Sequence, residues 1–267
     1  MIAITDQRSG RGLLLPALDA DVAMQPLLPD ASVGPLRVPL GLCVHASRYV
    51  AIADSGNGRI VVFDAASSTW SSFGAGTLAS PRAVVPDGAG GLLVADTARV
   101  VRVVDQTGAA PSDVLPPADG SLPLAVAARN GTDIDVATAD GRLRRTTDGG
   151  ATWTDIALDG PSPARPVALA RTATGATYVC DLGNARVLAV ADDGSVTTAL
   201  DERHGVVLPT AVAVADRDLF VVDTGANRIR RFALHDDRIE PAEYVNGRRP
   251  DGTFRFDRVG GITLGSF

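Results

Sequence analysis

The chain has 267 residues, 45% of them hydrophobic and 21% charged, so it can bury the core of a folded domain. Its formal net charge of −6 argues against a general nucleic-acid binder, which needs a basic surface to displace counterions. No segment holds the roughly 18 apolar residues of a membrane span, and the N-terminus lacks a signal-peptide pattern, so we expect a soluble, cytoplasmic protein without membrane contact.

Two further features of composition concern origin and redox chemistry. All 25 basic residues are arginines, and the abundance of Ala, Val, Gly and Asp is typical of a GC-rich bacterial genome. Cys43 and Cys180 lack metal-ligand spacing. We therefore expect both cysteines to be buried as small apolar residues.

A repeat runs through the whole chain. Six arginines recur at intervals of 40 to 50 residues, counting from the last across the chain ends to the first, and each follows a polar turn and opens a short apolar run: Arg11, Arg59, Arg99, Arg142, Arg186 and Arg228. A fixed period of this length predicts one supersecondary unit per repeat.

The other markers of the repeat predict its strands in chain order. A proline opens the first apolar run of most units, where its missing N–H costs no ladder bond: Pro39, Pro81, Pro123, Pro166 and Pro209. An aspartate ends the second run in several units: Asp6, Asp54, Asp96, Asp181 and Asp223. The arginine opens the third run, and a weaker fourth run such as 69–73 follows. Four antiparallel strands per unit, with almost no helix, predict a β-propeller.

The chain ends complete the ring. Residues 254–267 supply a first strand with Val259 in the position of the proline, and residues 2–11 resemble the second strand, the Asp turn and the start of the third strand of the same unit. The prediction is an all-β, six-bladed propeller in one domain, with one blade closed jointly by both termini so that no sheet edge stays open. The expected blades are 37–76, 77–117, 118–159, 160–201, 202–250, and 251–267 with 1–36.

The turn sequences resemble those of a known family. Asp54-Ser-Gly-Asn-Gly-Arg59 and Asp223-Thr-Gly-Ala-Asn-Arg228, each followed by an apolar strand, resemble NHL repeats, as does 251–254 leading into 260–262. In the third blade Thr138 or Asp140 stands in for the aspartate. That blade carries 146–153 (TTDGGATW), which is similar to the Asp box of sialidase-like propellers, where Asp and Gly shape a hairpin and Trp packs beneath it.

Two interpretations of the Asp/Arg turns remain open. An aspartate that ends one strand and an arginine that begins the next can pair across a hairpin or between blades, which would make the ring structural. Alternatively, Asp6, Asp54, Asp181, Asp223 and the six arginines form a ligand-binding ring on one face. In that case the guanidinium groups would grip a carboxylate or phosphate through forked hydrogen bonds.

The sequence offers little catalytic machinery. The NHL-like architecture implies relatives among metal-dependent lyases and lactonases, which need imidazole or carboxylate groups near the channel. Of three histidines only His204 falls in a connection on the expected functional face, whereas His45 and His235 fall on the opposite face. No Ser-His-Asp order, phosphate loop or paired-cysteine metal site is present.

These observations favour a noncatalytic binding or scaffold propeller. Its partner would be a protein, peptide or small-molecule ligand held at the loop-rich face around the central channel, with no cofactor and no nucleic acid. The alternative is a lactonase-like or lyase-like enzyme with a divalent cation, calcium or magnesium, in the channel.

Overall fold

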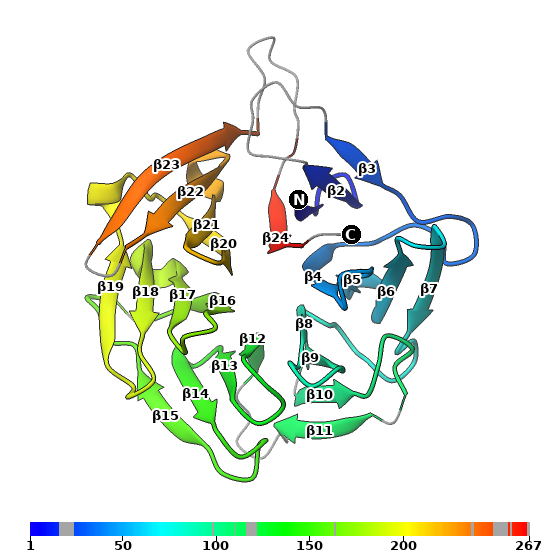
Figure 1. The fold of residues 1–267 in the computed structure, drawn as a ribbon, viewed down its shortest axis with the longest axis horizontal. Helices are drawn as coiled ribbons and strands as arrows, with labels where there is room; N and C mark the ends of the chain where they lie inside the picture. Colours follow the sequence, from blue (N-terminus) through cyan, green and yellow to red (C-terminus); the bar gives the residue numbers. More distant parts are fainter. Residues whose placement is uncertain are drawn as a thin grey trace.

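Six four-stranded antiparallel sheets form the molecule. The computed structural model describes residues 1–15, 24–97, 99–109, 111–115, 122–162, 164–235, 238–247, 256 and 258–265. Within these residues the sheets are arranged as blades around one axis, with the first strand of each blade innermost (Figure 1). The predicted all-β, six-bladed propeller is confirmed.

The first three blades follow one another along the chain, each in the order inner to outer strand. Blade 1 contains β4 (Pro39–His45), β5 (Tyr49–Asp54), β6 (Arg59–Asp64) and β7 (Thr69–Phe73). Blade 2 contains β8 (Ala83–Pro86), β9 (Leu92–Asp96), β10 (Arg99–Val103) and β11 (Ser112–Leu115). Blade 3 contains β12 (Pro123–Ala128), β13 (Ile134–Thr138), β14 (Arg142–Thr146) and β15 (Thr154–Ala157).

Blades 4 and 5 repeat this order, and blade 6 joins the two ends of the chain. Blade 4 contains β16 (Pro166–Arg171), β17 (Thr177–Asp181), β18 (Arg186–Val190) and β19 (Val196–Leu200). Blade 5 contains β20 (Pro209–Ala215), β21 (Asp218–Asp223), β22 (Arg228–Leu234) and β23 (Ile239–Asn246). Blade 6 contains β24 (Val259–Leu264), β1 (Ile2–Asp6), β2 (Arg11–Leu15) and β3 (Gln25–Leu27).

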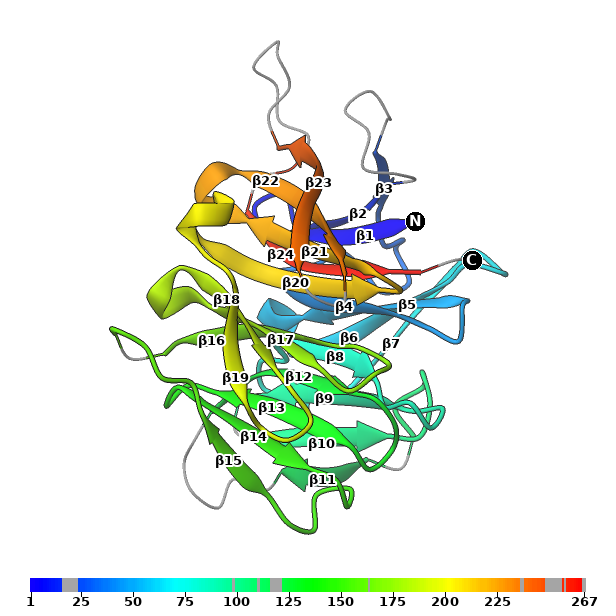
Figure 2. The same cartoon turned by 60° about the vertical axis from the view of Figure 1, so that its left-hand side comes forward.

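The closure of the ring by both termini is confirmed. C-terminal strand β24 pairs antiparallel with N-terminal strand β1, with Ile4 opposite Ile262, and Gly265 N–H donates to the Met1 carbonyl at 3.1 Å. The N-terminal strand β1 and the C-terminal strand β24 lie side by side in this blade, and the neighbouring blades stack face to face (Figures 1 and 2). Inner strand β24 also packs against β4 and β20, so the inner strands form a continuous ring.

The core lies between the blades rather than inside any one of them. One cluster, for example, combines Cys43 and Ile60 of blade 1 with Leu92 and Val101 of blade 2. Burying each large aliphatic side chain contributes about 1.5–3 kcal/mol. Both cysteines are free thiols in such clusters, as predicted, and burial raises the pKa of Cys43 to about 12.

A β-bulge marks the start of nearly every inner strand. In blades 3, 4 and 5 the residue after the strand-opening proline is skipped in the pairing with the second strand: Leu124, Val167 and Thr210. The pairing shifts in the same place in blades 1 and 6. Because a bulge turns the extra residue out of the regular ladder, these side chains point differently from their strand neighbours.

Helical structure in the described part of the chain is limited to four 3-10 turns: 55–57, 182–184, 202–204 and 224–226. None of the described helices is long and apolar enough to cross a membrane.

Candidate functional site

The Asp/Arg turn of blade 1 is held together by hydrogen bonds within the protein. Asp54 is fully buried, and its Oδ1 accepts a bond of 2.6 Å from the backbone N–H of Arg37, in the connection that enters the blade. Its Oδ2 accepts bonds from Arg59 Nε at 2.7 Å and from Asn57 Nδ2 at 2.8 Å. Arg59 also donates to the Val33 carbonyl at 2.6 Å. The aspartate thus ties the incoming connection to the second and third strands of its blade.

Blades 4 and 5 repeat this arrangement. Asp181 accepts from Arg165 N–H and from Arg186 Nε, both at 2.9 Å. Asp223 accepts from Leu208 N–H at 2.9 Å and lies 3.0 Å from Arg228 Nη2. Both carboxylates are fully buried.

The remaining predicted ring members are bound less tightly or to other partners. Arg11 Nη2 lies 3.9 Å from Asp6, a longer ion pair than those of blades 1, 4 and 5. Arg99 donates to Asp113 and to the Thr77 carbonyl. Arg142, in the blade where Thr138 replaces the aspartate, is more than half exposed and pairs with Asp155 at 2.9 Å.

His204 lies in the connection from blade 4 to blade 5, within the 3-10 turn 202–204. Its Nδ1 is 3.0 Å from Asp201 Oδ1, and its backbone carbonyl accepts a hydrogen bond from Arg230. Although burial raises it, the pKa of Asp201 is lowered overall by hydrogen bonds from the His204 ring and the Arg203 N–H. His204 thus closes its own turn, and it does not line the channel mouth described below.

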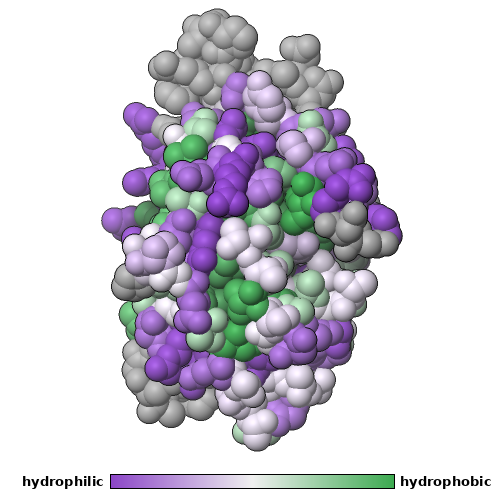
Figure 3. Space-filling model, turned by 90° about the vertical axis from the view of Figure 1, so that its left-hand side faces the viewer, coloured by the Kyte–Doolittle hydropathy of each residue, from purple (hydrophilic) through white to green (hydrophobic). Residues whose placement is uncertain are grey.

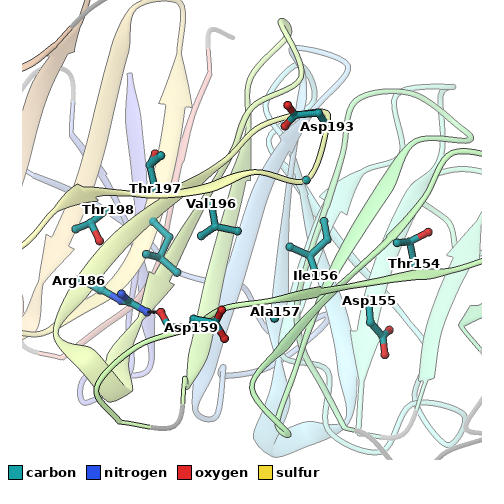
Figure 4. Close-up of a pocket in the computed structure, with 12 residues that line it drawn as sticks. Thr154, Asp155, Ile156, Ala157, Asp159, Arg186, Asp193, Val196, Thr197 and Thr198 are labelled. Carbon is teal, nitrogen blue, oxygen red and sulfur yellow. Dashed lines mark hydrogen bonds between the residues drawn. The ribbon is translucent and has the colours of Figure 1, made fainter.

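One cavity, of about 550 Å³, is a groove at the outer rim between blades 3 and 4. Ile156 of β15 and Val196 of β19 form apolar lining, and Arg186 reaches across to the Asp159 carbonyl (Figure 4). On this side of the molecule a hydrophobic patch is surrounded by mainly polar surface (Figure 3). Asp155, which also lines the groove, is held by Arg142 and Arg144 at 2.9 and 3.0 Å. Arg186 likewise pairs with Asp181 at 2.9 Å, so the charges of both Asp155 and Arg186 are already paired within the protein.

A second cavity opens where the channel meets the face of the Asp/Arg turns. We call it the channel mouth; its volume is about 410 Å³. Five of the six blades contribute the residue that follows the strand-opening residue, and blade 2 contributes the residue directly before its strand: Leu40, Leu124, Val167, Thr210, Gly260 and Arg82. Three residues come from positions that directly follow a turn aspartate: Gln7, Leu182 and Thr224. The lining is completed by Val259, which opens β24, and by three residues that precede inner strands: Arg165, Leu208 and Arg258.

The bulges explain why these residues meet. Leu124, Val167 and Thr210 are the residues that the bulges turn out of the ladder, so their side chains face the channel at its opening. Sequence reasoning pointed to the face around the central channel but missed the residues that line its mouth, because it followed the recurring Asp and Arg of each repeat. The signal that could have found it is the position after each strand-opening proline, which varies from blade to blade: Leu40, Arg82, Leu124, Val167 and Thr210.

Below the mouth the channel narrows and becomes apolar. A small cavity of about 90 Å³ lies between the inner strands and is lined mainly by glycine, alanine, valine and leucine. Gly41 and Gly261 allow this tight approach, since a Cβ on either would lie 2.8 Å from backbone atoms of the neighbouring strand. A ligand at the mouth would therefore rest on an apolar floor.

Among the described residues, the charged groups that line the mouth are three guanidiniums, whereas calcium and magnesium prefer carboxylate and carbonyl oxygens. Within the residues described above, no three His, Cys, Asp or Glu side chains gather as a metal site.

Comparison with known proteins supports the fold and leaves the function open. No family model matches the chain, and no curated protein matches it. A chain in the crystal structure of a nidogen/laminin complex is similar over 100% of this chain and 99% of its own length, with 16% identity and a TM-score of 0.77. Virginiamycin B lyase from Staphylococcus aureus is similar over 90% of this chain and 80% of its own, with 16% identity and a TM-score of 0.68. At such identities the likeness supports the β-propeller fold alone, because one of these chains comes from a protein complex and the other is a lyase.

Proposed function

We propose that the chain is a noncatalytic binding propeller that recognises its ligand or partner at the loop-rich face, in and around the channel mouth. The observation that carries the proposal is the mouth itself. It is a concave site of about 410 Å³ built from all six blades, within the range of about 300–1,000 Å³ typical of small-molecule sites.

The lining of the mouth supports binding more than chemistry. It combines guanidinium, hydroxyl and amide groups with aliphatic side chains. Such a set can orient a ligand through directed hydrogen bonds, while the aliphatic groups exclude water from it. The rim adds exposed aliphatic residues at the same face, which suit contact with a ligand or with a protein or peptide partner: Val38, Leu122, Val207 and Leu208.

A ligand screen with a narrowed mouth tests this proposal. Thermal unfolding is recorded for the wild type and for a Leu40→Trp/Leu124→Trp variant across a library of charged and neutral metabolites and short peptides. We expect at least one compound to raise the melting temperature of the wild type and to leave that of the variant unchanged. A compound present at 100 times its Kd stabilises the folded state by about 2.7 kcal/mol, a readily measured shift.

The same samples decide between binding and catalysis. Each compound that shifts the melting temperature is incubated with the protein, with and without added calcium or magnesium. The mass of the compound is then measured by mass spectrometry. A binding propeller returns the compound unchanged. A product that appears only with a cation would establish the lactonase-like or lyase-like alternative instead, and equal shifts in the wild type and the narrowed variant would place binding elsewhere.

We also assign the blades to the NHL type and residues 146–153 to an Asp box of structural role. The five-residue Asp-to-Arg spacing and the shared bonding of Asp54, Asp181 and Asp223 support the first assignment. For the second, Asp148 accepts from Thr152 N–H at 2.9 Å, and Trp153 Nε1 donates to the Gly150 carbonyl at 3.1 Å.

A further inference from the structure

We infer that the ligand of the channel mouth is a compact organic anion carrying two or three carboxylate or phosphate groups. This inference rests on the proposed binding function and specifies the class of ligand. It is carried by three arginines, Arg82, Arg165 and Arg258, which line the mouth together.

The guanidinium groups of these arginines are unpartnered. In the described part of the chain, no hydrogen bond or ion pair engages the side chain of Arg82, Arg165 or Arg258. Other arginines of the same face are held internally, as Arg59 is by Asp54 at 2.7 Å. The chain has 31 acidic and 25 basic residues, so acidic partners are in excess overall, yet no acidic residue that the structure describes lines the mouth. The local charge of the mouth is therefore opposite in sign to that of the whole protein.

The three arginines come from alternate blades. Arg82 precedes the inner strand of blade 2, Arg165 that of blade 4 and Arg258 that of blade 6. Because the inner strands form a closed ring, this spacing distributes three positive charges around the axis of the mouth. A concave site with one sign of charge focuses the field and raises the local concentration of anions. Guanidinium groups bind carboxylate and phosphate oxygens through paired hydrogen bonds.

The groups between the arginines suit the rest of such a ligand. Gln7, Thr210 and Thr224 offer neutral hydrogen-bonding groups to hydroxyl or further oxygen atoms. Leu124 and Val167 form an apolar surface for a carbon frame above the narrow channel. The charges line a concavity of about 410 Å³ rather than an open surface, which favours a small molecule over an extended chain.

Calorimetric titration at low salt tests the inference with citrate as the tricarboxylate probe and inorganic pyrophosphate as the phosphate probe. The proteins are the wild type, Arg82→Gln, Arg165→Gln, Arg258→Gln and a control, Arg37→Gln. Arg37 is an exposed arginine of the same face that does not line the mouth. Each variant is first compared with the wild type by circular dichroism and melting temperature, which exposed substitutions of this kind leave unchanged.

We expect saturable binding of at least one probe, at one site per chain. Each substitution in the mouth should weaken it by at least about tenfold, because each removes a charge-assisted hydrogen bond to the ligand. Arg37→Gln should change the affinity less than about twofold, since rim charges act mainly through screened long-range attraction. Whichever of citrate and pyrophosphate binds more tightly identifies the acidic group.

Three results would overturn the inference. The first is that neither probe binds; the second is that Arg37→Gln weakens binding as much as the three mouth variants do. The third is that an acidic octapeptide binds more tightly than both probes with the same dependence on the three arginines. A neutral compound that stabilises the wild type but not Leu40→Trp/Leu124→Trp would leave the binding function standing while rejecting the anion, so the two proposals fail separately.

Discussion

At the scale of the residue, the aspartate of each turn acts as a junction. In blades 1, 4 and 5 one carboxylate oxygen holds a backbone N–H of the incoming connection, and the other holds the arginine of the third strand. A buried carboxylate with both oxygens occupied in this way is costly to replace, because its partners would lose their bonds away from water. The geometry therefore supports the structural interpretation of the ring, and whether the ring also binds a ligand stays a prediction for mutation to test.

Asp54→Asn should destabilise the protein by about 3 kcal/mol, since it removes the charge that pairs with Arg59 in a buried site. The matched control is Asp140→Asn in blade 3, where Asp140 is 40% exposed and lies 3.5 Å from Arg142. That substitution should cost less than about 1 kcal/mol. Urea unfolding measures both. Equal stabilities of the two variants, with loss of ligand binding only in Asp54→Asn, would instead assign the turn to recognition.

The surface ion pair between Arg48 and Asp64 should make the stability of the protein depend on pH. Arg48 binds Asp64 through two hydrogen bonds of 2.7 and 2.5 Å, and this interaction holds the pKa of Asp64 well below its usual range. Because the folded-state pKa is lowered, the stabilisation is present above the unfolded pKa of about 3.9 and is lost as the pH falls through the folded value. Asp64→Asn should therefore be less stable than the wild type near pH 7, and the difference should shrink steadily below about pH 4.

Melting temperatures across this pH range provide the measurement. Arg48→Gln serves as the control, because it removes the same pair from the other side and should show the same loss at neutral pH. A difference in melting temperature between the wild type and Asp64→Asn that stays constant down to the lowest pH would contradict the lowered pKa of Asp64.

At the scale of the element, a buried ion network joins blades 3 and 4 on the face opposite the Asp/Arg turns. Arg171 of β16 has a side chain only 1% exposed and lies 2.9 Å from both Asp133 and Asp135. Asp135 of β13 also takes two hydrogen bonds from Arg145, at 2.8 and 3.0 Å. The sequence analysis did not identify this network, because its members occupy different positions in different repeats.

Removing one partner from this network should be costly. We expect Asp135→Ala to destabilise the protein by about 3–5 kcal/mol, because it leaves Arg171 and Arg145 buried with too little negative charge. The double variant Asp135→Ala/Arg171→Met should cost less than the sum of the single variants, as expected for side chains in contact. A cycle on the more exposed pair Arg99–Asp113 is the control, with an expected coupling below about 1 kcal/mol. Additive costs at Asp135 and Arg171 would mean that the two do not interact.

At the scale of the whole molecule, closure depends on one blade that both ends of the chain build. Strand β24 supplies the inner strand of blade 6, and β1, β2 and β3 supply the rest. The strand pairing between β24 and β1 therefore holds the ring shut, whereas the blades contact one another through packed side chains and inner strands and through individual hydrogen bonds and ion pairs.

A circular permutant tests the contribution of this closure. Residues 1 and 267 are joined, and new ends are placed at Gly76, in the connection between blades 1 and 2, where a Cβ would meet no other atom. Every blade then comes from a continuous segment, so the permutant should fold, but its urea midpoint should be lower because no strand pairing spans the gap. Deleting residues 259–267 should prevent folding, since β1 then loses its inner partner. A permutant as stable as the wild type would show that packing alone closes the ring.

The sequence determined the fold and part of its local chemistry. Prolines, aspartates and arginines at a constant period specify where strands begin and end, and this information is local, so six blades and the shared blade of the termini could be predicted. The pairing of Asp54 with Arg59 was also predictable, because five residues separate them across one turn.

Only the tertiary structure decided where the candidate site lies. Arg82 follows the recurring proline of its repeat, whereas Arg165 and Arg258 precede the strand-opening residue of theirs, and the three are far apart in sequence. They meet because ring closure brings alternate blades to one axis, and the bulges at the inner strands turn their neighbours Leu124, Val167 and Thr210 into the same opening. That these three arginines have no acidic partner among the described residues can be recognised only when the positions of the acidic residues in space are known. The repeat in the sequence therefore specified the scaffold, whereas the departures from that repeat, combined by closure of the ring, formed the site.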